Sequence, residues 1–563
     1  MSVRGLAAAV PVASHTRGVL LVAFLVFLVV MLLLCLMVGP EKDQIDDYYG
    51  GGRRIGLLGN ALALAGVCIP AGTVLGTTGT VALFGYDGIF ISLSTLLSLG
   101  VLLLLVNPLR RRGRFTIGDV LAHRAAGPEV RIASGVVAIA VCLPLLMFEL
   151  ASVGVSVALL LGLTGSSAQQ VITVMIGLLI ISATVFGGMR CTSALQIIKN
   201  IVLFSACAVV AMLVMSKFSW SADLLLDSAG RNSVRPAEYF TQGLSKQPDV
   251  SDAAADLDFV GLVLTIILGV ASMPHVIMRV NTLPALSSAT TAVRHVINIV
   301  AAFVLTAIVI GLGSAALVGS RSIVSVDPGG TSALMLLAGS LAGGTSTTGG
   351  TWLFVLVACA VFATILATTA SVTLAAAAAV AHDIYAQVLH GGAKEEVEVS
   401  AARWAAAGLG ALGIVLAVSV QGWNIQFLTT LALSISASSV LPALVYSLFW
   451  NGYTRTGLLW TLYGGLACSA GLQALSPAFT GRPDALFPGW DMNWYPLQSV
   501  ALVSVPVGFL LGWVTSRYGD PEKATRPRLK MPKRPNSQMG DSPGRASQVP
   551  EPTRDHFHRP GSR

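Results

Sequence analysis

The chain has 563 residues, of which 54% are hydrophobic and only 11% are charged, and its formal net charge is +8. A soluble protein carries about 25% charged residues, so the composition excludes an ordinary soluble domain and predicts an all-α polytopic membrane protein. The basic residues lie mostly in short loops and in the tail, as membrane topology requires, and so do not indicate a nucleic-acid partner.

Signals for enzymatic chemistry are missing from the sequence. The seven cysteines form no C-x-x-C pair, which argues against a zinc site or a disulfide framework. We find no G-x-x-x-x-G-K-[ST] motif, so ATP is not the evident energy source. We therefore expect a protein that is not an enzyme and that needs no organic cofactor.

The first apolar run, 18–38, is about 20 residues long and has no signal-peptide cleavage site after it. We expect a retained first transmembrane helix, preceded by a short extracytoplasmic N-terminus, 1–17.

The next apolar segment, 55–86, is interrupted in its middle by Pro70 and by several glycines. Proline removes a backbone donor and clashes with the preceding turn, and lipid supplies no replacement partners. The segment is therefore predicted to be a broken helix that lines a cavity, although a packing kink is the simpler alternative.

The remaining hydrophobic segments bring the expected number of transmembrane helices to about thirteen. They are expected near 89–108, 131–163, 168–186, 193–215, 257–278, 293–318, 351–381, 403–420, 425–450, 456–475 and 497–515.

Arginines set the expected orientation. The connection 109–131 holds six of them and marks the cytoplasm, which puts the polar loop 217–257 outside. The N-terminus is then outside and the C-terminus cytoplasmic.

The Gly/Ser/Thr-rich connection 319–350 is long enough for a short re-entrant or surface helix. The basic, Pro/Ser-rich tail, 517–563, is expected to be disordered.

The segment 257–278 contains a second interruption at Pro274, about 200 residues after Pro70. Paired interruptions at corresponding positions point to a transport site between two repeats. We expect a transport core over 55–450, built from five helices of each repeat, and two peripheral helices over 456–516.

Several stretches carry a resemblance to a known family. They are DYYGGGRRIG (47–56), LFGYDGI (83–89), RFTIGDVLAHR (114–124), VFGGMRCTSALQIIKN (185–200), SMPHVIMR (272–279), FATILATTASVTLAAAAAVAHDIY (362–385) and LPALVYSLFWNGYTRTG (441–457).

In these motifs the chain resembles the sodium:solute symporter family, and most closely its cation/acetate branch, which moves short monocarboxylates. The resemblance implies a 5+5 inverted-repeat (LeuT-like) core in the plasma membrane. It also implies alternating access around a site at the membrane midplane.

The resemblance further implies a Na⁺ site, the only metal site expected, between the first broken helix and the helix near 362–385. Carried over residue by residue, the ligands are the carbonyls of Gly66, Ile69, Thr364 and Ala367 and the hydroxyl of Thr368. Two positions depart from the branch, because Val67 replaces an acidic residue and Ala367 replaces a hydroxyl residue. The coupling ion is therefore left open between Na⁺ and H⁺. Threonines in membrane helices also often bond their own backbone.

A small carboxylate is expected at the start of the second half-helix, where free N–H groups can bind an anion. The candidate substrate residues are Pro70, Ala71, Gly72, Thr73, Ser152, Met273 and His275. His275 could donate to the carboxylate or titrate as the pH changes, and the simpler alternative is a satisfied core histidine.

Glu149 lies deep in the span 131–163, where an ionisable group is a functional candidate by default. It is a candidate for carrying a proton or balancing cation charge, or else a neutral acid bonded to Ser152 or to a neighbouring helix. Four other charged residues are expected to be topology anchors or gate partners near the membrane edges. These are Arg190, Lys199, Arg279 and Asp383.

The sequence thus predicts a secondary-active symporter that couples inward cation flux to uptake of acetate, propionate or pyruvate. Its expected partners are the carboxylate, a monovalent cation and the lipid bilayer. The alternatives are a symporter for another small solute, such as an amino acid or a sugar, and a sensor or accessory protein on the same fold.

Overall fold

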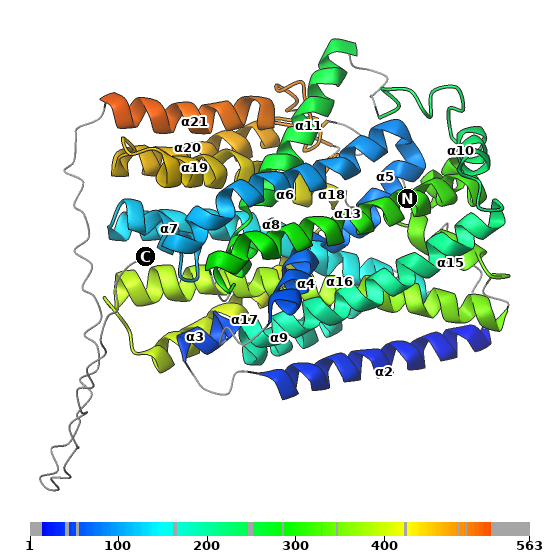
Figure 1. Ribbon diagram of the computed structural model, residues 1–563, viewed down its shortest axis with the longest axis horizontal. Coiled ribbons are helices and arrows are strands. Elements are labelled where there is room, and N and C mark those ends of the chain that lie inside the picture. Colours follow the sequence, from blue (N-terminus) through cyan, green and yellow to red (C-terminus); the bar gives the residue numbers. More distant parts are fainter. Residues whose placement is uncertain are drawn as a thin grey trace, which may run out of the picture. The chain divides into compact units, whose positions relative to one another are not determined.

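A computed structural model gives the structure of the chain, which is a bundle of helices (Figure 1). The residues that it describes are 14–39, 44–51, 56–161, 166–245, 252–283, 286–327, 329–344, 347–421, 425–481, 485–487, 489–490 and 492–518. The expected N-terminal segment 1–17 and tail 517–563 fall largely outside these residues.

The helices of the first half of the chain are α2 (Ser14–Val38), α3 (Ile45–Tyr48), α4 (Leu57–Cys68), α5 (Ala71–Phe84), α6 (Tyr86–Arg112), α7 (Ile117–Arg124), α8 (Pro128–Leu161), α9 (Ser166–Lys217) and α10 (Ala222–Arg231). Those of the second half are α11 (Asp252–Ser272), α12 (Pro274–Asn281), α13 (Leu286–Leu317), α14 (Ser320–Val326), α15 (Ala333–Ser340), α16 (Thr348–Ala378), the π-helix η2 (Ala379–Leu389), α17 (Glu395–Ser419), α18 (Gln426–Ile435), the π-helix η3 (Ser436–Val440), α19 (Leu441–Phe449), α20 (Arg455–Ala474) and α21 (Ala501–Tyr518).

Membrane-spanning character is clear from length and composition. Within the described residues, eight helices are long and apolar enough to cross a bilayer, or nine if α4 and α5 count as one bent span. The all-α polytopic prediction is confirmed. The count of about thirteen transmembrane helices stays a prediction.

The predicted break in the first core segment is confirmed. Helix α4 ends at Cys68, α5 begins at Ala71, and the two axes differ by 59°. Between them Ile69 adopts φ −117° and ψ 68°, and Pro70 is extended. Pro70 has no N–H to continue the α4 ladder, so the chain turns and a new helix starts after it.

The second broken segment is also present. Helix α11 ends at Ser272, Met273 is extended, and Pro274 opens α12. A further interruption lies inside α9, where Gly188 has φ 53° and ψ −154°. Only glycine adopts such angles readily, and this position lies between the two spans expected near 168–186 and 193–215.

Helix α16 lies in the interior of the bundle. In the apolar 18-residue stretch of α16 and η2, 89% is buried. Helix α16 packs against α8 and α9 and continues into η2 without a loop. The connection that follows α13 forms the two short helices α14 and α15, and α10 lies in the polar connection after α9. The bundle therefore encloses α16 beside the break between α4 and α5, which α16 also contacts.

Candidate functional site

The break between α4 and α5 presents backbone carbonyls that no helix ladder fully uses. Gly66 and Ile69 are both buried, and the Gly66 carbonyl accepts only a 3.2 Å bond from the Ile69 N–H among backbone donors. Unwound carbonyls of this kind bind cations in membrane transporters. The pair thus has the chemistry that the sequence analysis expected of it.

A side chain from α9 already contacts these carbonyls. The ammonium of Lys199 donates to the Gly66 carbonyl at 2.6 Å and to the Ile69 carbonyl at 2.5 Å. A third, longer contact of 3.4 Å reaches the side-chain oxygen of Gln196. Lys199 has no exposed surface, so the positive charge at the break belongs to the protein itself.

The expectation that Lys199 is an anchor near a membrane edge is therefore wrong. The described part of α9 continues past the turn at Gly188, so Lys199 lies inside the second half of this helix rather than at its end. Arg279 and Asp383 are also buried, with 2% and 1% exposure. Arg279 donates to the hydroxyls of Ser193 and Thr192.

Helix α16 supplies the other expected cation ligands, and their groups bond within the protein. The Thr368 hydroxyl donates to the Thr364 carbonyl at 2.8 Å. The Ala367 carbonyl accepts from the Gln196 amide at 2.9 Å and from the Ser371 hydroxyl at 3.0 Å. The threonines thus follow the back-bonding alternative, and Gln196 joins α16 to the Lys199 site.

Glu149 is fully buried on α8, and neither carboxyl oxygen has a hydrogen-bond partner. Its carboxyl faces the Lys199 ammonium and the Ala71 amide that opens α5, without reaching hydrogen-bond geometry with either. Ser152 is not its partner, because that hydroxyl donates to the Phe148 carbonyl at 2.7 Å. The alternative of a carboxyl bonded to Ser152 is therefore wrong.

The expected substrate residues lie on or next to three helices, α5, α8 and α12. Pro70 precedes α5, and its carbonyl accepts from the Thr73 N–H at 3.0 Å. Gly72 packs closely on Phe148, whose ring lies 3.2 Å from the position that a Cβ would take. Met273 and His275 are both buried at the start of α12, and Nδ1 of His275 has no partner. Ala71 and Ser152 are buried as well.

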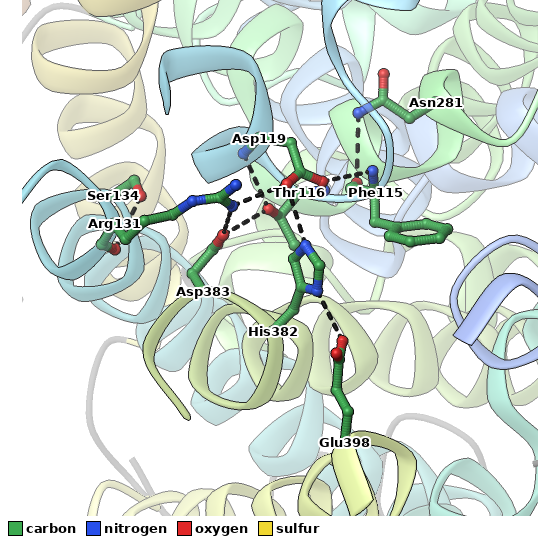
Figure 2. Close-up of polar contacts among 9 residues, drawn as sticks. All are labelled: Phe115, Thr116, Asp119, Arg131, Ser134, Asn281, His382, Asp383 and Glu398. Carbon is green, nitrogen blue, oxygen red and sulfur yellow. Dashed lines mark hydrogen bonds and ion pairs between the residues drawn. The ribbon is translucent and has the colours of Figure 1, made fainter. Parts of the chain in front are cut away.

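A second polar cluster joins α7, α8, η2 and α17 (Figure 2). One guanidinium nitrogen of Arg131 lies 2.8 Å from a carboxylate oxygen of Asp119 and 2.6 Å from one of Asp383. Nδ1 of His382 lies 2.7 Å from Glu398, and Nε2 lies 3.0 Å from Asp119. We call these five residues the α7-end network.

The α7-end network brings together Asp119, His382 and Asp383 closely enough to hold a metal ion. The guanidinium of Arg131 lies between the two aspartates, however, and takes the place that a cation would need (Figure 2). Burial alone would raise the pKa of Asp119, but its hydrogen bond with His382 and the nearby charge of Arg131 hold it well below its ordinary value. The network is a set of ion pairs that joins four helices rather than a metal centre.

A cavity of about 550 Å³ opens between η2 and α17. Its lining includes Tyr385, Ser400 and Trp404, and it lies on elements other than α4 and α5. It therefore does not coincide with the expected carboxylate site.

Comparison with known families decides the identity. The model of the sodium:solute symporter family matches residues 48–465. The chain belongs to the sodium:solute symporter family.

Two relatives within this symporter family match nearly the whole chain. The monocarboxylic acid transporter of Corynebacterium glutamicum is 35% identical over 508 residues, which is 89% of this chain and 91% of that protein. The uncharacterized symporter YwcA of Bacillus subtilis is 33% identical over 498 residues, which is 87% of this chain and 93% of that protein.

Solved structures confirm the LeuT-like fold of this symporter. A Na⁺-coupled sialic acid symporter in a substrate-bound outward-open state aligns with a TM-score of 0.66 over 88% of this chain and 97% of that chain, at 13% identity. The structure of MhsT in complex with L-phenylalanine aligns with a TM-score of 0.51 over 82% of this chain and 98% of that chain, also at 13% identity.

Sequence reasoning placed Lys199 of this symporter wrongly and did not predict the α7-end network. Lys199 carries a signal that could have revealed it, because it lies within the predicted span 193–215, where a lysine is costly unless it has partners. The α7-end network is harder to predict from the sequence than Lys199, because Arg131 and Asp383 are 252 residues apart and no local pattern pairs them.

Proposed function

We propose that this symporter takes up a small monocarboxylate, such as acetate, propionate or pyruvate, together with a monovalent cation across the plasma membrane. The similarity to a protein named monocarboxylic acid transporter over 89% of the chain supports the substrate class. The site must then bind one carboxylate and the small apolar group attached to it.

The observation that carries this proposal is the start of α5. The break leaves the first N–H groups of α5 without helical partners, and such a helix N-terminus favours an anion. The Lys199 ammonium lies at the same break and adds a full positive charge. The Phe148 ring against Gly72 offers an apolar wall of the kind that a methyl group prefers.

Uptake of labelled acid tests the proposal. Cells that express the full chain should accumulate labelled acetate and pyruvate above the level of cells with an empty vector. Uptake is measured at pH 6 and pH 8, with sodium present or replaced by choline. Excess unlabelled propionate should compete with the label, whereas alanine and glucose should not.

Three results would count against the proposal. Competition by alanine would indicate an amino-acid substrate, and competition by glucose would indicate a sugar substrate. Absence of any uptake above the vector control would favour a sensor or accessory role on the same fold.

A further inference from the structure

The expected sodium ligands do not fit a sodium ion in the arrangement described above. Two of the five oxygens, the carbonyls of Gly66 and Ile69, accept from the Lys199 ammonium. The hydroxyl of Thr368 is used within α16, and the Ala367 carbonyl already accepts two bonds. A sodium ion at this point would compete with an ammonium for the same carbonyls and would be repelled by its charge.

We infer that Lys199 is the resident cation of this site and that Glu149 is its acidic partner, so that the chain couples monocarboxylate uptake to protons rather than to sodium. This inference rests on the proposed function for its substrate and deepens it by naming the coupling ion. It assigns to Lys199 and Glu149 a proton-carrying role.

Geometry first supports the role of Lys199. An ammonium has three N–H donors and no acceptor, and the three contacts at Gly66, Ile69 and Gln196 account for all three. Only the charged form can donate to all three of these oxygens at once. A neutral amine offers two donors, so loss of the proton loosens this attachment and removes the positive charge from the break.

Glu149 supplies the second protonatable group. A buried carboxyl without any hydrogen-bond partner is unfavourable as an anion, and both of its oxygens are in this situation. Its carboxyl faces the same α5 amide that we assign to the substrate carboxylate. The side chain therefore lies where its charge state decides whether a second anion can approach.

The titratable and charged groups that face Lys199 come from three helices. They are Glu149 of α8, Cys68 of α4 and His275 of α12, and Arg279 of α12 adds a further positive charge next to His275. The α16 groups close to the site are hydroxyls and carbonyls, which do not titrate. Glu149 is thus the acidic carboxyl in this set.

The proton count of the pair follows directly. With one proton shared between them, the pair is neutral, either as ammonium and carboxylate or as amine and acid. A second proton produces an ammonium beside a neutral acid, and this net positive pair attracts the substrate anion. Release of that proton on the other side restores the neutral pair and weakens the hold on the anion. One proton therefore crosses with each monocarboxylate, and the cycle moves no net charge.

Sodium binding by the purified full-length protein tests the inference without any substrate. The melting temperature of the wild-type protein in detergent should be the same in sodium chloride and in choline chloride. Lys199→Ala should empty the carbonyls of Gly66 and Ile69, so that sodium raises the melting temperature of this variant. Lys217→Ala, which removes the exposed lysine at the end of the same helix, should behave as the wild type.

Proteoliposomes test the coupling itself. Pyruvate is used because little of it is in the neutral form that crosses lipid unaided. An inward proton gradient should drive its accumulation, a sodium gradient should not, and a membrane potential should have no effect. The double variant Lys199→Arg/Glu149→Gln keeps a permanent positive charge, and neither of its two side chains can release a proton. It should lose proton-driven accumulation but retain exchange of internal for external pyruvate.

The outcomes separate the two proposals. Sodium-dependent stabilisation of the wild-type protein, or accumulation driven by a sodium gradient, would overturn the role of Lys199. Proton-driven accumulation in the double variant would overturn the proton-carrying role of the pair, and loss of exchange together with accumulation would reduce the pair to a structural role. If the wild-type protein moves no pyruvate at all, the proposed substrate fails, and the sodium-binding measurement still decides on Lys199.

Discussion

At the scale of single residues, Gly66 shows how little space the site leaves. A Cβ added there would lie 2.5 Å from the side-chain oxygen of Gln196 and 3.0 Å from its backbone carbonyl. Gln196 in turn bonds Ala367 and Ser371 of α16. The absence of a side chain at Gly66 therefore lets α4, α9 and α16 meet at one point.

Gly66→Ala should destabilise the protein by about 1–3 kcal/mol, because overpacking of a well-filled interior costs this much. It should also displace Gln196 and weaken uptake. Gly76→Ala in α5 is the control, since a Cβ at Gly76 meets no atom within 4 Å. That change should stabilise the helix by about 0.5–1 kcal/mol. Thermal unfolding of both purified variants in detergent makes the comparison, and equal melting temperatures would refute this account of Gly66.

The sequence predicted that the carbonyls of Gly66 and Ile69 are free of a helix ladder, but it did not predict that Lys199 donates to them. The unused carbonyls at the break follow from Pro70 alone, since proline ends the hydrogen-bond ladder. The presence of Lys199 follows from the three-dimensional path of α9. From the turn at Gly188, Lys199 is about 16 Å along the helix, which is about half the ~30 Å hydrocarbon thickness. This simple length argument would have excluded a position at the membrane edge.

At the scale of elements, the α7-end network ties a short connecting helix to the end of η2. Thr116 and Asp119 form a capping box that starts α7, and the same Asp119 carboxylate accepts from Arg131 and from His382. Because Asp383 lies on η2, the network couples the position of α7 to the helix that continues α16.

Arg131→Leu should break this network and cost about 3–5 kcal/mol, because it leaves the buried Asp383 carboxylate without its cation and leaves Asp119 with His382 alone. The control is Arg231→Leu, whose ion pair with Asp227 is exposed and should contribute about 0–1 kcal/mol. Thermal unfolding at neutral pH measures the difference. A loss in Arg131→Leu no larger than that of the control would show that the network does not stabilise the fold.

The same network sets an acid dependence. The pKa of Asp119 is held below its ordinary value, so its stabilisation is complete above about pH 4 and is lost as the pH falls further. In Arg131→Leu one cause of that lowered pKa is gone. The melting temperature of the variant should therefore fall less steeply with acid than that of the wild-type protein.

The sequence predicted the broken elements well and the π-helical ones not at all. Pro70 and Pro274 indicate interruptions because proline cannot continue a helix hydrogen-bond ladder. Gly188 allows one because glycine adopts backbone angles that other residues resist. The π segments η2 and η3 contain no proline or glycine that would mark them in the sequence as departures from a regular α-helix. In the same way, no local pattern could pair Arg131 with Asp383.

At the scale of the whole molecule, the described helices form one bundle in which the break of α4 and α5 meets α9 and α16 in the interior (Figure 1). Hydrophobic spans and the family resemblance were sufficient to predict this architecture. The number of transmembrane helices is harder to predict, because α4, α5, α20 and α21 are each shorter or less apolar than a regular span.

Membrane orientation is a prediction that belongs to this scale. We expect α10 outside the cell and the start of α17 in the cytoplasm, because arginine-rich connections stay inside. Single cysteines at exposed positions, Asp223→Cys in α10 and Glu396→Cys in α17, report on the two sides. A membrane-impermeant maleimide added to intact cells should label position 223 but not 396, after subtraction of the unsubstituted background. The reverse labelling would invert the topology.

The π-helix η3 makes chain length matter as much as residue type. The Ser438 carbonyl of η3 points at two glycines, Gly465 of α20 and Gly508 of α21, neither of which has space for a Cβ. Beyond η3, the carbonyls of Ser447 and Leu448 accept from Arg112. Deleting one residue in η3 would rotate everything after it by about 100° and would turn these carbonyls away from Arg112. Point substitutions among small residues preserve that rotational phase, so family members should keep the length of this segment more strictly than the identity of each residue.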